Sequence, residues 1–442
     1  MKNWICKKWY MFFIITVVFT SCFILNQNMF WANELAQDTV TVVIDPGHGG
    51  DPLVDEANGG ANYQNIYEKD LNLIVAKAME KELNTYKGVK VYLTRSEDIS
   101  LDLQKRIEFA KEKNADILIA LHFNASERHL FYGSEVWVSA FGENYSEGYS
   151  IATCFMNQFQ NKGLLDRGIK TRIGKDGTDY YGIIRHGVEA NIPAIIVEHC
   201  YMDDTYDYQF ADSNEELLQF GINDATAVAN YYGLNKDAAP KLIQKTVSMP
   251  VLDAPVLPDP TEPEIESVEL LSYDFKQGKI KVKIQAYEPE SKLLYYGYSL
   301  NGGESYSSLM PWNSDDDTEE VELSIPKEYQ GNLQIVLFNN YNMDTLSEPL
   351  VCNGKSGKSV GHEVGVIKEY DLEDAYDFTT IKNKVSENAL GEIITSKEPL
   401  SKSSRYEIIL FLLVTLFLIL LGIFMGLLFA IKLRKGKLKN RI

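Results

Sequence analysis

Over the first half of the chain, the hydrophobic pattern switches repeatedly between two periods. Short runs rich in β-branched residues and bounded by turn residues are typical of buried strands. Longer stretches with apolar residues three and four positions apart predict helices, as for Leu71, Ile74 and Val75. This alternation predicts an α/β domain over residues 39–235, with a mostly parallel sheet and helices on both faces. The predicted strands cover residues 41–44, 89–94, 116–121, 134–138 and 194–197, and the predicted helices cover 68–86, 101–113, 147–161 and 215–232.

The pattern changes after residue 235. Residues 236–266 contain six prolines, which predicts an extended, semi-rigid linker. Residues 267–351 lose the helical period, and residues 279–284 alternate strictly between polar and apolar, as in a half-buried strand. We therefore expect a small immunoglobulin-like β-sandwich there. Residues 352–407 are polar and weakly patterned, which favours a flexible stalk.

Both ends of the chain are apolar. Lys2, Lys7 and Lys8 precede an apolar run, so residues 1–32 fit a signal peptide or an N-terminal membrane anchor. Residues 408–431 contain no charge and are long enough for a transmembrane helix. The basic tail that follows, residues 432–442, favours the cytoplasmic side. These features predict a cell-membrane protein with a single pass near its C-terminus and the α/β domain outside the membrane.

Charge and cysteine content narrow the function classes. The formal net charge is −19, which argues against a nucleic-acid partner because such binders carry basic surfaces. The five cysteines are scattered, so neither a disulfide framework nor a cysteine zinc site is supported.

Four polar residues lie where an α/β domain places its chemistry. His48 follows the first predicted strand, His122 and Glu198 end later strands, and Glu68 begins the first long helix. Ligands of such folds bind beyond the carboxyl ends of the strands. Two histidines and one carboxylate are a common catalytic zinc shell, and a second carboxylate can transfer protons. Other triples can be drawn from the same sequence, and His48 alone fits a surface turn equally well, so spacing leaves the choice open.

Several sequence blocks resemble one family. They occur in that family's order, from Val43-Ile44-Asp45-Pro46-Gly47-His48-Gly49-Gly50 through Tyr67-Glu68-Lys69-Asp70-Leu71-Asn72-Leu73 and Leu93-Thr94-Arg95 to Ala115-Asp116-Ile117-Leu118-Ile119-Ala120-Leu121-His122-Phe123-Asn124-Ala125 and Pro193-Ala194-Ile195-Ile196-Val197-Glu198. Together they resemble the bacterial zinc-dependent N-acetylmuramoyl-L-alanine amidases with a type-3 amidase domain. The resemblance implies one Zn²⁺ held by His48, Glu68 and His122, with Glu198 as the catalytic carboxylate. It also implies that the chain cleaves the amide between N-acetylmuramic acid and L-alanine in peptidoglycan.

The sequence also departs from this family. Apolar or small residues usually follow the catalytic carboxylate, whereas His199 follows it here. We expect His199 to be structural, because it points to the opposite face of the strand from Glu198. Arg185 and Asn124 are candidate substrate-binding residues. The alternatives are an ion pair for Arg185 and a loop-shaping role for Asn124.

Two other functions fit the same residues. The chain could be a catalytically silent scaffold that binds peptidoglycan, or a zinc peptidase that acts on the stem peptides. For the β-domain, a spacer role stands beside binding of a wall polymer or a protein partner.

Overall fold

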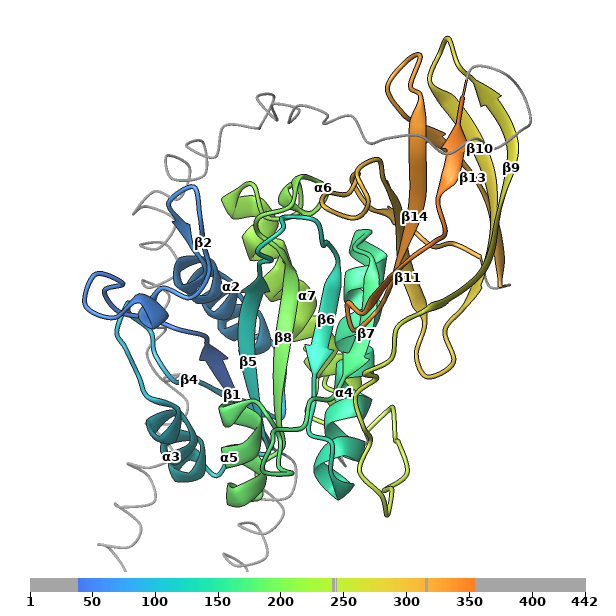
Figure 1. Cartoon of the computed structure of the whole chain (residues 1–442). Helices are drawn as coiled ribbons and strands as arrows, with labels where there is room; N and C mark the ends of the chain where they lie inside the picture. The colour runs from blue at the N-terminus through green and yellow to red at the C-terminus, as the bar shows by residue number, and fades with distance from the viewer. Residues whose placement is uncertain (1–38, 241–242, 244, 315–316, 354–442) are drawn as a thin grey trace, which may run out of the picture. The chain divides into compact units, whose positions relative to one another are not determined.

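The computed structural model describes residues 39–240, 243, 245–314 and 317–353 (Figure 1). The predicted N-terminal segment 1–32, the helix 408–431, the tail 432–442 and the stalk beyond Asn353 lie outside these residues. Among the described residues, no helix has the length and apolar character needed to span a bilayer. The predicted transmembrane helix and the membrane localisation built on it are therefore not retained.

A six-stranded sheet forms the centre of the α/β domain, in the order β4-β1-β5-β8-β6-β7 (Figure 1). Adjacent strands run parallel except at one position, where β6 is antiparallel to β8. The sheet is therefore mixed, and the prediction of a mostly parallel sheet was wrong. The bounds are β1 Val40–Pro46, β4 Val89–Leu93, β5 Ile117–Asn124, β6 Ser134–Trp137, β7 Asp166–Lys170 and β8 Ala194–Tyr201.

The reversal follows from the short connection between β5 and β6. Residues 125–133 contain no helix, and a parallel connection needs a crossover of a dozen or more residues. The chain therefore turns back at the edge of the sheet where β5 ends, and β6 runs antiparallel to β8. The hydrophobic pattern identifies a strand here but carries no information on its direction.

Helices cover both faces of the sheet, and each face has its own apolar core. One core lies against the face that carries Val42, Ile119 and Val197, and includes residues of α2, α4 and α7. The other contains Leu118 and Ile196 together with residues of α3 and α5. The bounds are α2 Glu68–Leu83, α3 Leu103–Lys113, α4 Gly142–Lys162, α5 Gly182–Ala190 and α7 Asn214–Tyr232.

Shorter elements lie on two connections, one from β1 to α2 and the other from β8 to α7. They are η1 Glu56–Asn58, the hairpin strands β2 Asn62–Tyr63 and β3 Ile66–Tyr67, and α6 Thr205–Tyr208. Residues 47–67, which include η1 and the hairpin, therefore carry the chain from β1 to the start of α2.

Two antiparallel sheets form the β-domain. They are ordered β13-β10-β9 and β12-β11-β14-β15, and β16 pairs with β14. Alternate residues of β10, such as Val282 and Ile284, pack with Ile335 and Leu337 of β14 in one buried cluster. The bounds are β9 Glu264–Asp274, β10 Lys279–Tyr287, β11 Leu293–Ser299, β12 Met310–Pro311, β13 Thr318–Ser324, β14 Gly331–Asn339, β15 Asp344–Leu346 and β16 Leu350–Cys352.

The β-domain packs directly against the α/β domain. Tyr132, in the loop before β6, shares a buried apolar cluster with Tyr295 of β11 and Phe338 of β14. The proline-rich segment also lies on the α/β domain, since Val256 N donates to Ala140 O at 2.9 Å and Thr171 Oγ1 donates to Val256 O at 2.7 Å.

Candidate metal centre

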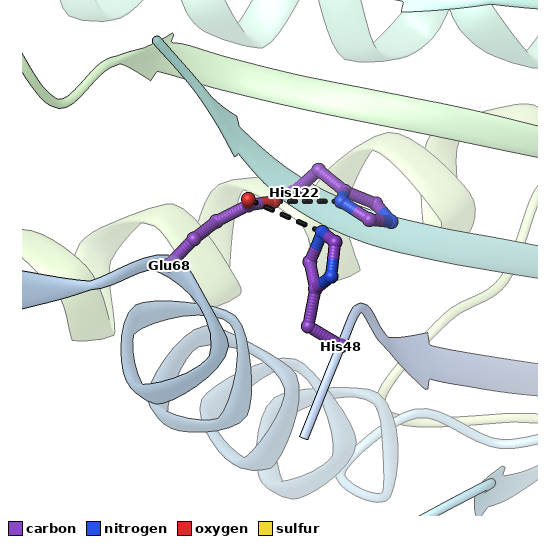
Figure 2. A group of neighbouring side chains, drawn as sticks. All are labelled: His48, Glu68 and His122. Atoms are coloured by element: carbon purple, nitrogen blue, oxygen red, sulfur yellow. Dashed lines mark hydrogen bonds and ion pairs between the residues drawn. The ribbon is translucent and has the colours of Figure 1, made fainter. Parts of the chain in front are cut away.

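The structure brings together His48, Glu68 and His122, as the sequence predicted (Figure 2). One candidate ligand atom from each residue lies within 4.8 Å of the other two. His48 Nε2 is 3.2 Å from Glu68 Oε2, and His122 Nδ1 is 2.7 Å from Glu68 Oε1. The two ring nitrogens therefore face the same carboxylate. His48 lies in the loop after β1, Glu68 begins α2 and His122 lies on β5, so three distant parts of the sequence meet here.

The position of His48 depends on its loop. Its φ of 59° lies in the left-handed region, and Gly49 and Gly50 follow with positive φ values. The ring nitrogen Nδ1 is 2.9 Å from Ala57 O. Because that carbonyl can only accept, Nδ1 carries a proton, and Nε2 is the ring nitrogen that faces Glu68. A second partner of this kind fixes the ring orientation of metal-ligating histidines.

Two buried arginines hold the backbone of the same loop. Arg95 donates from Nε to Pro46 O at 2.9 Å and from Nη2 to Gly47 O at 2.8 Å. Arg106 donates from Nη2 to His48 O at 2.8 Å and forms an ion pair with Asp45 at 2.7 Å. Their forked geometry satisfies several loop carbonyls that burial would otherwise leave unpaired.

Glycines let the backbone approach the three side chains closely. A Cβ atom at Gly47 would lie 2.3 Å from His122 Cε1. One at Gly60 would lie 2.4 Å from Glu68 Oε2 and 2.5 Å from His48 Cδ2. No larger residue fits at either position without moving a candidate ligand.

Glu68 is 5% exposed, yet its surroundings favour the ionised form. Burial alone would raise its pKa, but the hydrogen bonds and charges of His122 and His48 outweigh burial, so the pKa lies well below the usual 4.5. Backbone donors add to this, since Ala61 N is 2.9 Å from Oε2 and Phe123 N is 3.3 Å from Oε1. A buried carboxylate beside two imidazoles is a chemically suitable donor set for a divalent cation.

Glu198 lies on the neighbouring strand, at the register position paired with His122. Burial, followed by the charges of Glu68 and Glu135, raises its pKa well above 4.5. Its Oε2 atom is buried and has no hydrogen-bond partner among the described residues. This carboxyl group can therefore carry a proton next to the candidate metal ligands, as a general acid and base requires.

A buried charge cluster continues along the sheet from Glu198. Glu135 of β6 pairs with Glu198 across the antiparallel ladder. Its Oε2 atom lies 2.8 Å from Arg167 Nε and 2.6 Å from Lys170 Nζ. Burial would raise the pKa of Glu135, but Lys170 and Arg167 lower it to about 2. This cluster was not predicted from the sequence. Its only sequence signal is an acid inside a short strand, which becomes informative once the strand order is known.

The two predicted substrate-binding residues have structural partners. Asn124 Nδ2 donates to Glu135 Oε1 at 3.0 Å, which links the end of β5 to the charge cluster. Arg185 Nη1 donates to the carbonyls of Asp179 and Tyr180 at 2.8 and 3.1 Å. Neither residue belongs to the metal-ligand group, so a role in substrate binding stays a prediction for both.

Comparison with known proteins gives one consistent family. A family model described as N-acetylmuramoyl-L-alanine amidase matches residues 42–230. The chain is 30% identical over 185 residues to the N-acetylmuramoyl-L-alanine amidase LytC of Bacillus subtilis, covering 40% of this chain and 32% of LytC. It is 28% identical over 207 residues to the amidase CwlM of Bacillus licheniformis, covering 45% of this chain and 72% of CwlM. The chain thus spans about a third of LytC and most of CwlM.

Solved structures also match this chain. The catalytic domain of CwlV, an N-acetylmuramoyl-L-alanine amidase from Bacillus (Paenibacillus) polymyxa, matches with 26% identity and a TM-score of 0.37. The match covers 45% of this chain and all of that domain.

Proposed function

We propose, from the membership of residues 42–230 in the N-acetylmuramoyl-L-alanine amidase family, that this chain hydrolyses the amide between N-acetylmuramic acid and L-alanine in peptidoglycan. The resemblance stated from the sequence blocks is confirmed by the family match. The observation that carries the proposal is the group of His48, Glu68 and His122, with Glu198 paired to His122 on the next strand.

The donor set favours zinc as the metal. Two imidazole nitrogens and one carboxylate are the protein ligands of many catalytic zinc sites, in which a water molecule takes the fourth position. We therefore propose one Zn²⁺ per domain, held by His48, Glu68 and His122. When bound, zinc supplies a polarising cation for the amide carbonyl and acidifies its water.

The protein groups around this centre have separate tasks. Glu68 stays ionised and keeps His48 and His122 directed toward one point. Glu198 is suited to take a proton from the attacking water and give it to the leaving amine, because its raised pKa makes it a weaker acid than an exposed carboxyl. The leaving amine would otherwise depart as a strongly basic anion, so protonation at this position lowers the barrier.

The direct test uses the full chain with purified peptidoglycan. We expect stoichiometric zinc in the purified protein and release of stem peptides that begin with a free L-alanine amino group, identified by mass. The Glu198→Gln variant should retain zinc and lose turnover, because Gln keeps the shape of the side chain and cannot carry the proton. Cleavage within the stem peptide would instead identify a peptidase. A zinc-loaded protein that binds peptidoglycan and releases nothing would identify a silent scaffold.

A further inference from the structure

A histidine and an aspartate lie buried directly behind the candidate metal centre. His199 follows Glu198 on β8 and points into the apolar core on the opposite face, and Asp224 reaches it from α7. Both side chains are fully buried. The ring of His199 stacks on Phe123 with centroids 5.0 Å apart, and meets Phe220 edge-on at 4.9 Å. Two polar groups in such a core need a reason, because burying them costs free energy unless both are hydrogen-bonded.

Both ring nitrogens of His199 are in use. Nε2 is 2.9 Å from Asp224 Oδ2, and Nδ1 is 2.9 Å from the carbonyl oxygen of His122. A carbonyl oxygen only accepts, so the proton must lie on Nδ1. Asp224 then either accepts from Nε2 as a carboxylate or donates to it as a carboxylic acid. In both cases Asp224 fixes the ring orientation and leaves a proton on Nδ1, with which His199 donates to the His122 carbonyl.

The contacted carbonyl belongs to a peptide group that is held from both sides. The peptide between His122 and Phe123 has its C=O bonded to His199, and its N–H lies 3.3 Å from Glu68 Oε1. One continuous hydrogen-bond chain therefore runs from Asp224 through His199 and this peptide to Glu68. Hydrogen bonds in such chains polarise one another in a low-dielectric interior. The chain ends on a carboxylate that also faces the rings of His48 and His122.

The backbone is irregular at this point. The register between β5 and β8 shifts between His122 and Asn124. Bulges next to active sites redirect a side chain, and they interrupt the regular ladder that would otherwise fix the strand. The bond from His199 falls at this irregularity, where the main chain that carries His122 needs another support.

We propose that His199 and Asp224 are positioning residues, which fix the His122–Phe123 peptide and through it the orientation of His122 and Glu68 toward the metal. The inference rests on the proposed function only in taking these residues as metal ligands. Neither His199 nor Asp224 touches the substrate. The structural role that the sequence predicted for His199 is then the support of this peptide.

The test compares two amide variants of one position in the full chain. The amide nitrogen of Asn in His199→Asn occupies nearly the place of Nδ1 and keeps the bond to the His122 carbonyl. Gln in His199→Gln reaches the place of Nε2 and keeps only the bond to Asp224. The measurements are the zinc Kd by chelator competition, kcat and KM on peptidoglycan, and thermal unfolding of the metal-free protein.

We expect His199→Gln to bind zinc about tenfold or more weakly than the wild type, because loss of outer-shell partners typically costs 10–100-fold in metal affinity or activity. Its kcat should fall with KM nearly unchanged. His199→Asn should recover most of both properties. Asp224→Asn is the matched control on the partner, because its amide can donate to Nε2 and leave the proton on Nδ1; its zinc Kd should stay within about threefold of the wild type.

Equal zinc affinities for the two His199 variants, or weaker binding by His199→Asn, would overturn the inference. A purely structural role would lower the unfolding temperature of both variants and leave their zinc affinities alike. The zinc measurement needs no peptidoglycan, so it decides the inference even if the wild type binds zinc and releases no L-alanine termini, a result that would refute the proposed function alone.

Discussion

The Glu135 cluster allows a quantitative test of the structure. One buried carboxylate forms ion pairs with two buried cations, Arg167 and Lys170. The substitution Glu135→Gln keeps the size and one acceptor oxygen but removes the charge. Arg167 retains Tyr295 Oη at 2.5 Å and Asn342 Oδ1 at 2.8 Å, so its guanidinium stays hydrogen-bonded without being neutralised.

The expected cost depends on pH. Breaking a buried ion pair by removing one partner typically costs about 3–5 kcal/mol, so we expect about 3 kcal/mol or more at about pH 7. Burial lowers the pKa of Lys170 to about 8 even with Glu135 present, and loss of Glu135 lowers it further. At about pH 7, folding of the variant therefore requires Lys170 to lose its proton, which the wild type does not require. At about pH 9, Lys170 is already neutral in the folded wild type as well. One pKa unit corresponds to about 1.4 kcal/mol, so the cost should be smaller by about that amount at about pH 9.

At acidic pH the cost of the substitution changes in the opposite direction and becomes smaller as the pH falls. The pKa of Glu135 is lowered from 4.5 to about 2 in the folded state, so its stabilising effect is complete above 4.5 and is lost as pH falls toward about 2. Wild type and variant should therefore converge at low pH. The assay is urea unfolding, followed by fluorescence and circular dichroism, at about pH 3, 7 and 9. A cost below about 1 kcal/mol at about pH 7, or one that is no smaller at about pH 9, would refute the assigned pairing of Glu135 with Lys170.

The metal centre and the domain contact give three further predictions. Removal of the metal with a chelator should abolish hydrolysis, and added zinc should restore it; hydrolysis that persists in metal-free protein would contradict the assigned chemistry. Gly60→Ala should weaken zinc binding by at least tenfold, because its Cβ would meet Glu68 Oε2, whereas Gly177→Ala, with a similar positive φ and nothing within 4 Å, should bind zinc normally by the same chelator titration. Tyr295→Phe should lower the free energy of unfolding by about 1–3 kcal/mol, because it removes partners of Arg167 Nη1 and Tyr132 O, and an unchanged urea midpoint would count against the contact.

The candidate metal ligands could be predicted because each one follows a local signal. His48 and His122 lie at the ends of β-rich runs, and Glu68 begins a clear amphipathic helix, so the fold rule and the family blocks indicate the same residues. Their convergence required only that β1 and β5 be neighbours, as they are in the sheet.

The rest depends on pairings that no local pattern encodes. The direction of β6 follows from a loop length, and β7, residues Asp166–Lys170, was missed because three of its five residues are charged. Arg167 and Lys170 are nevertheless buried, because both form ion pairs with Glu135 on the neighbouring strand β6. The short helix α5, Gly182–Ala190, was also missed, because nine residues give little more than two turns of periodicity. His199 was correctly placed on the face opposite Glu198, but its partner Asp224 is known only from the packing of α7.

The aromatic contact between the two domains decides where the chain can be shortened. A truncation after residue 235 would uncover Tyr132, Phe131 and the guanidinium of Arg167, which now pack against Tyr295 and Phe338. Such a fragment would expose apolar aromatic rings and an unpartnered face of the Arg167 guanidinium to water. Arg167 lies on β7, two strands away from Glu198 on β8. Low solubility or weak turnover of such a fragment would therefore reflect the loss of this contact, and a shortened chain must include the β-domain strands β11 and β14 to keep it.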